Sequence, residues 1–265
     1  MRIGLLYGLG PDAIDAMGGS YRPALEQIEE ADRLGLDSVL FEEHHGARGC
    51  PTPGALAGAA AARTRTIRVG SLDRQPVLEF PVGVAEDWAV LDNLSRGRAI
   101  LGVSPGERPG ELRAAGVPWD EREGRFREAV DLIRTSWTQT TFQFTGEHYQ
   151  FPLGASGPPG FRREPADAWV SPDAGFVEQW RRGRVSPEFL SVTPRPVQLP
   201  HPPIWVTACR RETIEWAAGR GLPYVAPAFL TEDEVRNSID WYREALEAAG
   251  RRPEEVDVVV ARRRS

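Results

Sequence analysis

The sequence predicts an α/β fold of the TIM-like (β/α) barrel type, a curled parallel sheet covered by helices. Short apolar runs alternate with longer segments of helical periodicity along most of the chain. This pattern is typical of repeated strand–helix units with buried parallel strands. The seven predicted strands show little sign of a central change in strand order, which favours a barrel over an open doubly wound sheet. An open Rossmann-like sheet is the alternative fold.

The predicted elements follow one another in regular order. The short apolar runs predict strands at residues 3–7, 38–42, 66–71, 98–103, 203–208, 222–226 and 256–261. Apolar residues at helical spacing predict helices at residues 21–35, 53–64, 80–95, 121–137, 211–221 and 232–250. Because a standard barrel has eight strands, we expect a barrel that lacks the eighth.

Residues 138–200 interrupt this alternation. They are rich in Pro and Gly and contain short aromatic runs such as TFQFTGEHYQF. We expect an irregular insertion there, with a hairpin as the one regular element that the pattern suggests. The substrate specificity of the protein would lie in this insertion. The whole of residues 1–265 is expected to form a single domain.

The composition argues against several functions. The net charge of −6 argues weakly against nucleic acid as the main partner. All 32 basic residues are arginine, which excludes a lysine Schiff base and a P-loop lysine. No Gly-x-Gly-x-x-Gly segment follows the first predicted strand, so a built-in nicotinamide site is not indicated.

The same composition predicts a cytoplasmic location. Cys50 and Cys209 are the only cysteines, too few for a disulfide framework. The chain contains no run of about 18 apolar residues, the length that a membrane-spanning helix needs, so no membrane span is expected. The first residues enter a strand directly, which leaves no room for a signal peptide.

Glu42, Glu43, His44 and His45 follow the second predicted strand. The carboxyl ends of barrel strands build the active site, and histidine exchanges protons near neutral pH. Since neighbouring strand residues point to opposite faces, we expect one histidine to be catalytic and the other to support it. The alternative is that both are ordinary polar residues closing a strand. A metal site is not expected, because adjacent histidines are poorly spaced for shared ligation.

Two further segments end predicted strands and should face the same mouth. Tyr7 ends the first strand, and Ser71-Leu72-Asp73 ends the third. They would either line the face of a bound cofactor or cap their strands.

An ordered series of motifs gives a family resemblance. The blocks are GLDSVLFEEHHG, AAAARTRTIRVGS, AEDWAVLDNLSRGRAILGV, GRFREAV, PPIWVTA and ETIEWAAGRGLPYV. In this order the chain resembles the bacterial luciferase-like flavin monooxygenases over most of residues 1–261. The resemblance implies a barrel with reduced flavin at its carboxyl-terminal mouth.

The resemblance also implies roles for single residues. His44 would be catalytic, and Glu43 and His45 would support it. The flavin phosphate would lie near Ala208, Arg210 and Thr213, where a helix begins and offers free N–H groups. Arg125 would lie in the flavin region.

One segment departs from the family pattern. Many relatives carry a phosphate-holding arginine after the fourth strand, and Pro105 stands about there in this chain. Arg108 or Arg210 would compensate, or phosphate affinity would be weak. Ser104, in the same segment, is also expected to contact the cofactor.

The function implied is a flavin-dependent monooxygenase that uses reduced FMN and O2 on a small organic substrate. A separate flavin reductase would supply the reduced cofactor. The alternatives are an F420-dependent oxidoreductase of the same fold and a non-catalytic flavin-binding protein.

The missing eighth strand leaves two apolar edge strands that need cover. Relatives dimerise through their second and third helices, and the run GALAGAAAA in the second allows close helix approach. We therefore expect a homodimer whose main interface does not cover the gap. Residues 138–200 would cover it in part, and the flavin site would be more open than in longer relatives.

Overall fold

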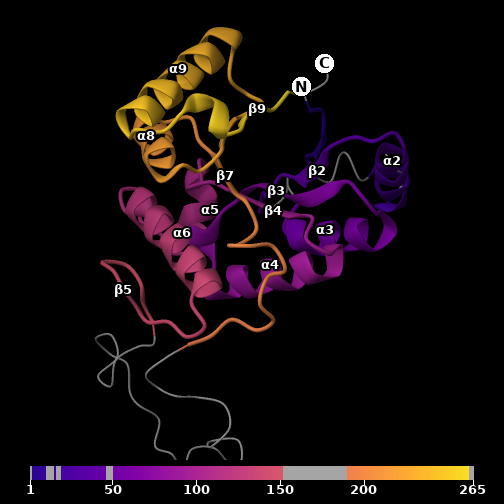
Figure 1. Ribbon diagram of the computed structural model, residues 1–265, viewed down its shortest axis with the longest axis horizontal. Helices are drawn as coiled ribbons and strands as arrows, with labels where there is room; N and C mark the ends of the chain where they lie inside the picture. Colours follow the sequence, from indigo (N-terminus) through magenta and orange to yellow (C-terminus); the bar gives the residue numbers. More distant parts are fainter. Residues whose placement is uncertain (1, 10–14, 16–18, 46–49, 152–189, 263–265) are drawn as a thin grey trace, which may run out of the picture.

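The computed structural model describes residues 2–9, 15, 19–45, 50–151 and 190–262. Its centre is a seven-stranded parallel sheet in the spatial order β1-β2-β3-β4-β7-β8-β9 (Figure 1). This order follows the sequence without a reversal, and the sheet curls into a half-barrel. The predicted barrel type is thus confirmed, and the sheet is not the open doubly wound sheet that was the alternative. The strands are β1 (Leu5–Tyr7), β2 (Ser38–Phe41), β3 (Arg68–Arg74), β4 (Ala99–Val103), β7 (Ile204–Thr207), β8 (Tyr224–Ala226) and β9 (Val258–Val260).

Helices cover the outer face of the sheet. All six predicted helices are present. The structure adds a short helix, α5, which the sequence did not predict because its six residues carry too little periodicity. None of the helices in the described ranges is long and apolar enough to cross a membrane. The helices are α2 (Arg22–Arg33), α3 (Pro53–Arg63), α4 (Pro81–Ser95), α5 (Pro109–Ala114), α6 (Arg122–Thr138), α8 (Arg211–Arg220) and α9 (Glu232–Ala248), with single turns η1 (Pro76–Leu78) and η3 (Pro253–Glu255).

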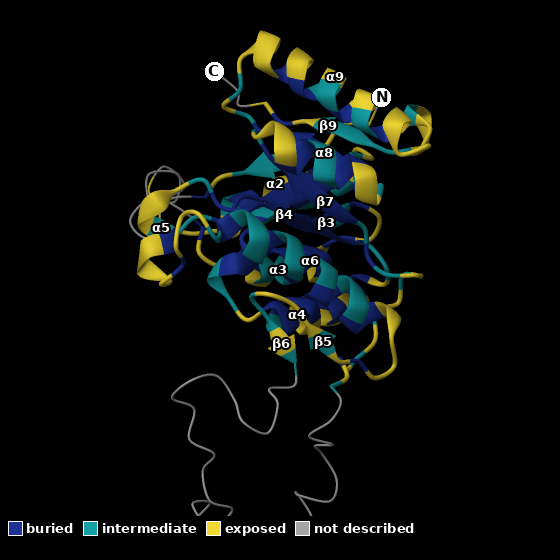
Figure 2. Ribbon diagram, turned by 90° about the vertical axis from the view of Figure 1, so that its left-hand side faces the viewer, coloured by how far each residue is buried: buried dark blue, intermediate teal, exposed yellow. Residues whose placement is uncertain are grey.

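Two apolar layers lie on the two faces of the sheet. Its central strands are buried, whereas the edge strands β1 and β9 are partly exposed (Figure 2). On β2, Val39 and Phe41 join the layer between sheet and helices, whereas Leu40 joins the layer inside the curl. This is the alternation expected of a strand. The inner layer consists of Leu40, Leu72, Ile100, Trp205, Val225 and Ala261. Inside the curl Gly102 is required, since a Cβ there would lie 2.3 Å from the Ser71 carbonyl oxygen.

The described part of the insertion forms a hairpin, as expected, from β5 (Phe144–Thr145) and β6 (Gln150–Phe151). Its turn is held on α6 by the Glu128 carboxylate, which accepts N–H groups of three successive residues at 2.7–3.1 Å. Phe151 packs edge-on against Phe80 at the start of α4. Residues 152–189 lie outside the described residues. The hairpin lies below α6, far from β9 and the chain ends (Figure 1).

The two edge strands come close without pairing. β1 pairs with β2 and β9 with β8, and no β1–β9 pairing occurs among the described residues. An ion pair between Arg2 and Asp257 joins the amino-terminal ends of these edges. Nothing in residues 138–151 or 190–200 pairs with either edge, so the predicted cover depends on residues outside the described ranges.

Candidate active site

A cavity of about 130 Å³ opens at the carboxyl ends of five neighbouring strands. Every contribution comes from a strand end or the loop after it, which is where barrel enzymes build their active sites. The lining residues are Glu42 and His44 after β2, Leu72, Asp73 and Gln75 at β3, Ser104, Glu107, Arg108 and Glu111 after β4, Thr207, Ala208 and Cys209 after β7, and Pro227, Ala228 and Phe229 after β8.

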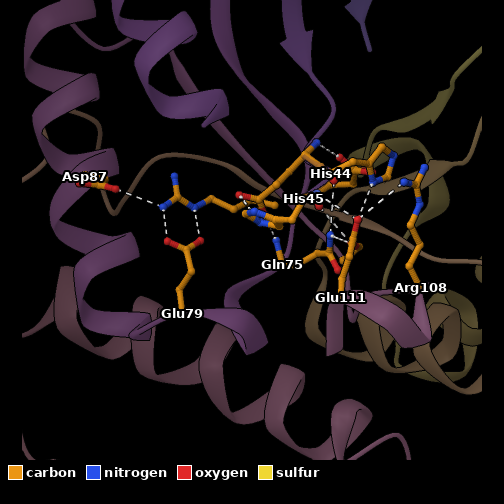
Figure 3. A network of polar contacts seen from close by, with 11 residues as sticks. His44, His45, Gln75, Glu79, Asp87, Arg108 and Glu111 are labelled. Carbon is orange, nitrogen blue, oxygen red and sulfur yellow. Dashed lines mark hydrogen bonds and ion pairs between the residues drawn. The ribbon is translucent and has the colours of Figure 1, made fainter. Parts of the chain in front are cut away.

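The end of β3 turns two consecutive residues into this cavity. Its pairing with β4 shifts register between Ser71 and Arg74, so Leu72 and Asp73 both line the cavity. Arg74 anchors the strand end from behind, with two hydrogen bonds to Glu79 at 2.9 and 2.6 Å and one to Asp87 at 3.1 Å (Figure 3). A partly buried bidentate pair of this kind limits the geometry that the strand end can adopt.

The two histidines take different positions. His44 lines the cavity, and its backbone N–H donates to the Cys50 carbonyl at 3.0 Å. His45 is not among the lining residues, and its Nε2 lies 3.7 Å from Oε1 of the buried Glu43. Glu43 in turn accepts the Gln75 backbone N–H at 2.6 Å. The alternation of successive side chains therefore separates the two histidines. His44 faces the cavity, whereas His45 lies beside Glu43 behind it.

Carboxylates dominate the polar lining. Glu42, Asp73, Glu107 and Glu111 border the cavity, and Arg108 is the cation among the lining residues. Gly106 has φ +84°, and a Cβ there would lie 2.7 Å from Gln75 Oε1, so glycine lets the loop after β4 approach the end of β3.

Burial changes the ionisation of three groups at the site. It raises the pKa of Asp73 to about 8 and that of Glu43 to about 7, with neighbouring carboxylates adding to the effect. It raises the pKa of the Cys209 thiol to about 11, to which Glu107 contributes. Asp73 therefore holds a proton near neutral pH, and Cys209 stays an unreactive thiol.

Three of the expected cofactor residues lie on the cavity: Ser104, Arg108 and Ala208. Ser104 donates its backbone N–H to the Arg74 carbonyl at 2.8 Å, which ties the end of β4 to β3. Arg108 lies 3.6 Å from Glu111 with 45% of its side chain exposed. A partly exposed cation at the rim of the cavity suits an anionic group that reaches in from solvent.

Tyr7 and Ser71 do not line the cavity, contrary to expectation. The Tyr7 ring stacks on Phe41 on the outer face of the sheet, and its hydroxyl donates to Gln27 of α2 at 2.8 Å. Ser71 is fully buried and donates to the Gly102 carbonyl at 2.7 Å. Both lie one position away from the inward-facing set, so Tyr7 packs against a helix and Ser71 joins β3 to β4.

Arg125, Arg210 and Thr213 also lie away from the cavity lining. Arg125 pairs with Glu121 along α6 at 2.7 Å. The exposed Arg210 guanidinium lies 5.8 Å from the Trp119 ring centroid. Thr213 is buried and donates its hydroxyl to Glu123 at 2.6 Å, which fastens α8 to α6. In this conformation the start of α8 is held by helix packing.

Sequence reasoning did not single out Gln75, Glu107 or Glu111 as site residues. Gln75 and Glu107 each lie four residues after a predicted strand end and Glu111 lies eight after one, so their place after a strand end was the available signal. The signal was weak because β3 runs to Arg74, three residues beyond the predicted end at 71. Glu111 lies on α5, which was not predicted.

Comparisons with known proteins agree with the fold. The family model described as luciferase-like monooxygenase matches residues 1–170 and 176–264. An F420-dependent glucose-6-phosphate dehydrogenase of Amycolatopsis mediterranei is 34% identical over 138 residues, which are 49% of this chain and 41% of that protein. The chain spans about half the length of the curated relatives it matches.

Two solved structures share the fold. Monooxygenase RslO1 from Streptomyces bottropensis aligns with a TM-score of 0.77 at 28% identity, over 98% of this chain and 70% of that one. The oxygenating constituent of 3,6-diketocamphane monooxygenase of Pseudomonas putida, solved with FMN, aligns with a TM-score of 0.71 over 98% of this chain and 66% of that one. Its identity of 19% shows the fold alone.

Proposed function

Because the chain belongs to the luciferase-like monooxygenase family, we propose that it is a flavin-dependent monooxygenase acting on a small organic substrate with reduced FMN and O2. One observation carries the proposal: His44 lines a cavity built by the carboxyl ends of five neighbouring strands. The relatives include F420-dependent and FMN-containing proteins, so a flavin-type cofactor is the chemistry they have in common.

The residues at the cavity suit such a cofactor. Gln75 is buried, and its Oε1 has no hydrogen-bond partner among the described residues, so it can accept an N–H group from a ring system. Arg108 can pair with a phosphate. Ala208 and Ala228 offer apolar surface on the opposite wall of the cavity.

The chain's own residues would handle protons and water. A reduced flavin supplies the electrons with which O2 is activated. His44 would move a proton at the imidazole that faces the cavity, and Asp73, whose pKa is raised to about 8, would hold a second proton beside it. The apolar inner layer below the cavity keeps water from entering through the curl.

A separate reductase would deliver the reduced cofactor. The test supplies reduced FMN enzymatically and follows O2 uptake and product formation across a panel of aldehydes, ketones and aromatic compounds. Substrate-dependent O2 uptake that disappears in His44→Ala supports the proposal. Saturable binding without turnover on any substrate would point instead to a flavin-binding protein.

An F420-dependent oxidoreductase is the second candidate, favoured by the 34% identity to an F420-dependent dehydrogenase. Parallel titrations with FMN and F420 distinguish the two cofactors, because each has its own visible absorbance band. Tighter binding of F420 and hydride transfer without O2 would replace the monooxygenase proposal.

The active form would be a homodimer joined through α3. The outward face of this helix carries Ala55, Gly58, Ala59 and Ala62, none of which is buried. Small side chains at this spacing let a second helix approach closely.

A further inference from the structure

Glu111 connects three loops at the rim of the cavity. It lies on α5, and only 8% of its side chain is exposed. Its Oε1 accepts the His45 backbone N–H at 3.0 Å, and its Oε2 accepts Nε2 of Gln75 at 3.0 Å (Figure 3). One carboxylate thereby joins the segment after β2, the end of β3 and the helix after β4.

The same carboxylate lies beside two basic groups. Glu111 Oε1 is 3.9 Å from Nδ1 of His44 and 3.6 Å from Nη1 of Arg108. Figure 3 shows the side chains of Arg108 and Glu111, both at the start of α5, meeting that of His44 from the segment after β2. At such distances a carboxylate favours the protonated form of an imidazole and limits the orientations of its ring.

We propose that Glu111 is a positioning residue that holds the His44–His45 segment and orients the His44 imidazole toward the cavity. Its role in turnover rests on the proposed function, because His44 is the proton-moving group there. The contacts themselves need neither cofactor nor substrate. The backbone hydrogen bond to His45 sets the path of the segment, and the carboxylate charge acts on the ring of His44.

Other ionisable groups surround His44 and have to be separated from Glu111. Glu42, Asp73, Glu107 and Cys209 border the same cavity. Glu43 lies beside His45, with 3.7 Å between Oε1 and Nε2. All of these groups are still present when Glu111 alone is changed, so a difference between the parent and a Glu111 variant reports the contribution of Glu111.

Glu111→Gln removes the charge and keeps the shape. The remaining carbonyl oxygen can still accept the His45 N–H. The new NH2 group would face the Gln75 NH2, and a flip of the Gln75 amide would present Oε1, which has no partner among the described residues, as the acceptor. The variant should therefore fold, and its effect on His44 should be electrostatic.

The test is an NMR titration of the histidine ring signals in the protein without added flavin. The chain has four histidines, and the His44 signal is identified by its loss in His44→Asn. Glu111→Gln should lower the pH midpoint of His44 by about one unit, because a carboxylate near the ring is gone. An unchanged midpoint would overturn the proposal, whatever happens to thermal stability.

A matched control removes another carboxylate at the same distance from another imidazole. Glu121 Oε2 lies 3.9 Å from Nδ1 of His148, outside the cavity lining. Glu121→Gln should leave the His44 midpoint as in the parent. If it moves that midpoint as far as Glu111→Gln does, the effect is a general one of net charge and the proposal fails.

If Glu111→Gln fails to fold, Arg108→Gln provides a second titration, in which the His44 midpoint should shift in the opposite direction. The partly exposed side chain of Arg108 can be replaced at little cost in packing. With Arg108 gone, the Glu111 charge is no longer shared with a second cation, so the His44 midpoint should rise. A fall would contradict the proposal. Because none of these readouts requires turnover, they stand or fall separately from the proposed monooxygenase activity.

Discussion

At the residue scale, the site consists of carboxyl groups arranged around one imidazole. Asp73 and Glu43 are connected directly, since the Glu43 backbone N–H donates to Asp73 Oδ1 at 2.7 Å. Burial raises the pKa of both groups, to about 8 for Asp73 and about 7 for Glu43. Groups that titrate near neutral pH beside His44 are typical of sites that move protons.

His44 and His45 should differ in their effect on activity. His44→Ala should lower turnover by about 10²- to 10⁴-fold, the usual contribution of a general acid or base, with cofactor affinity nearly unchanged. His45→Ala should cost less, because its ring faces Glu43 behind the cavity. Turnover and cofactor affinity measured for both variants test this, and equal losses would show that position on the cavity does not decide the role.

The buried acids should make stability depend on pH. Their folded-state pKa values are raised from 3.8 and 4.5 to about 8 and about 7. Between these limits the folded chain keeps protons that the unfolded chain has released. The free energy of unfolding should therefore fall as pH rises from about 4 to about 8. Asp73→Asn should flatten this fall, as measured by urea unfolding across that range. The exposed Asp240→Asn is the control, and identical slopes in all three proteins would refute the expectation.

At the element scale, strand ends decide which side chains meet. The shift of register in β3 turns Asp73 inward, and α5 brings Glu111 over the histidines. The end of β7 supplies Ala208 to the cavity, while Arg210 and Thr213 at the start of α8 contact Trp119 and Glu123. The cation best placed for a phosphate is therefore Arg108.

Two arginine variants test whether Arg108 or Arg210 contacts the phosphate of FMN. Arg108→Ala should weaken FMN by about 1.5 kcal/mol, the value of a partly exposed charge-assisted contact, and should leave riboflavin unchanged because it has no phosphate. Arg210→Ala should have a smaller effect on both ligands. Fluorescence titrations with FMN and riboflavin measure all four affinities. A larger FMN loss in Arg210→Ala would return the phosphate site to the start of α8.

The sequence predicted the elements better than the directions of their side chains. The strands and main helices could be found because buried strands and amphipathic helices have different periods, 2 and 3.6. His44 could be placed for the same reason, since it follows an apolar strand directly. Tyr7 and Ser71 could not, because a one-residue difference in where a strand enters the curl exchanges its inner and outer faces. Glu111 could not either, since a six-residue helix carries little periodicity.

At the scale of the whole molecule, the half-barrel has two edges. Within the part of the chain that the structure describes, β1 and β9 each have one strand partner, and an exposed ion pair between Arg2 and Asp257 links the segments that precede them. The mouth lies at the opposite ends of these strands.

The oligomeric state can be tested on the face of α3. An added Cβ at Gly58 of α3 or Gly219 of α8 meets no atom within 4 Å, so both positions have open space where a larger side chain would begin. Gly58→Arg should convert the expected homodimer to a monomer in size-exclusion chromatography with light scattering. Gly219→Arg should remain a dimer. A monomeric parent at micromolar concentration would remove the dimer from the account.

The most direct measurement of the central claim is anaerobic equilibrium dialysis of reduced FMN against three proteins: the parent, Ala228→Trp and Ala248→Trp. Ala228 lines the cavity, whereas Ala248 is exposed at the end of α9. The account predicts one saturable site per chain in the parent and in Ala248→Trp. In Ala228→Trp the affinity should fall at least about tenfold, or about 1.4 kcal/mol, because indole fills the cavity. Equal binding by all three proteins, or none by the parent, would contradict the assignment of this cavity to the flavin.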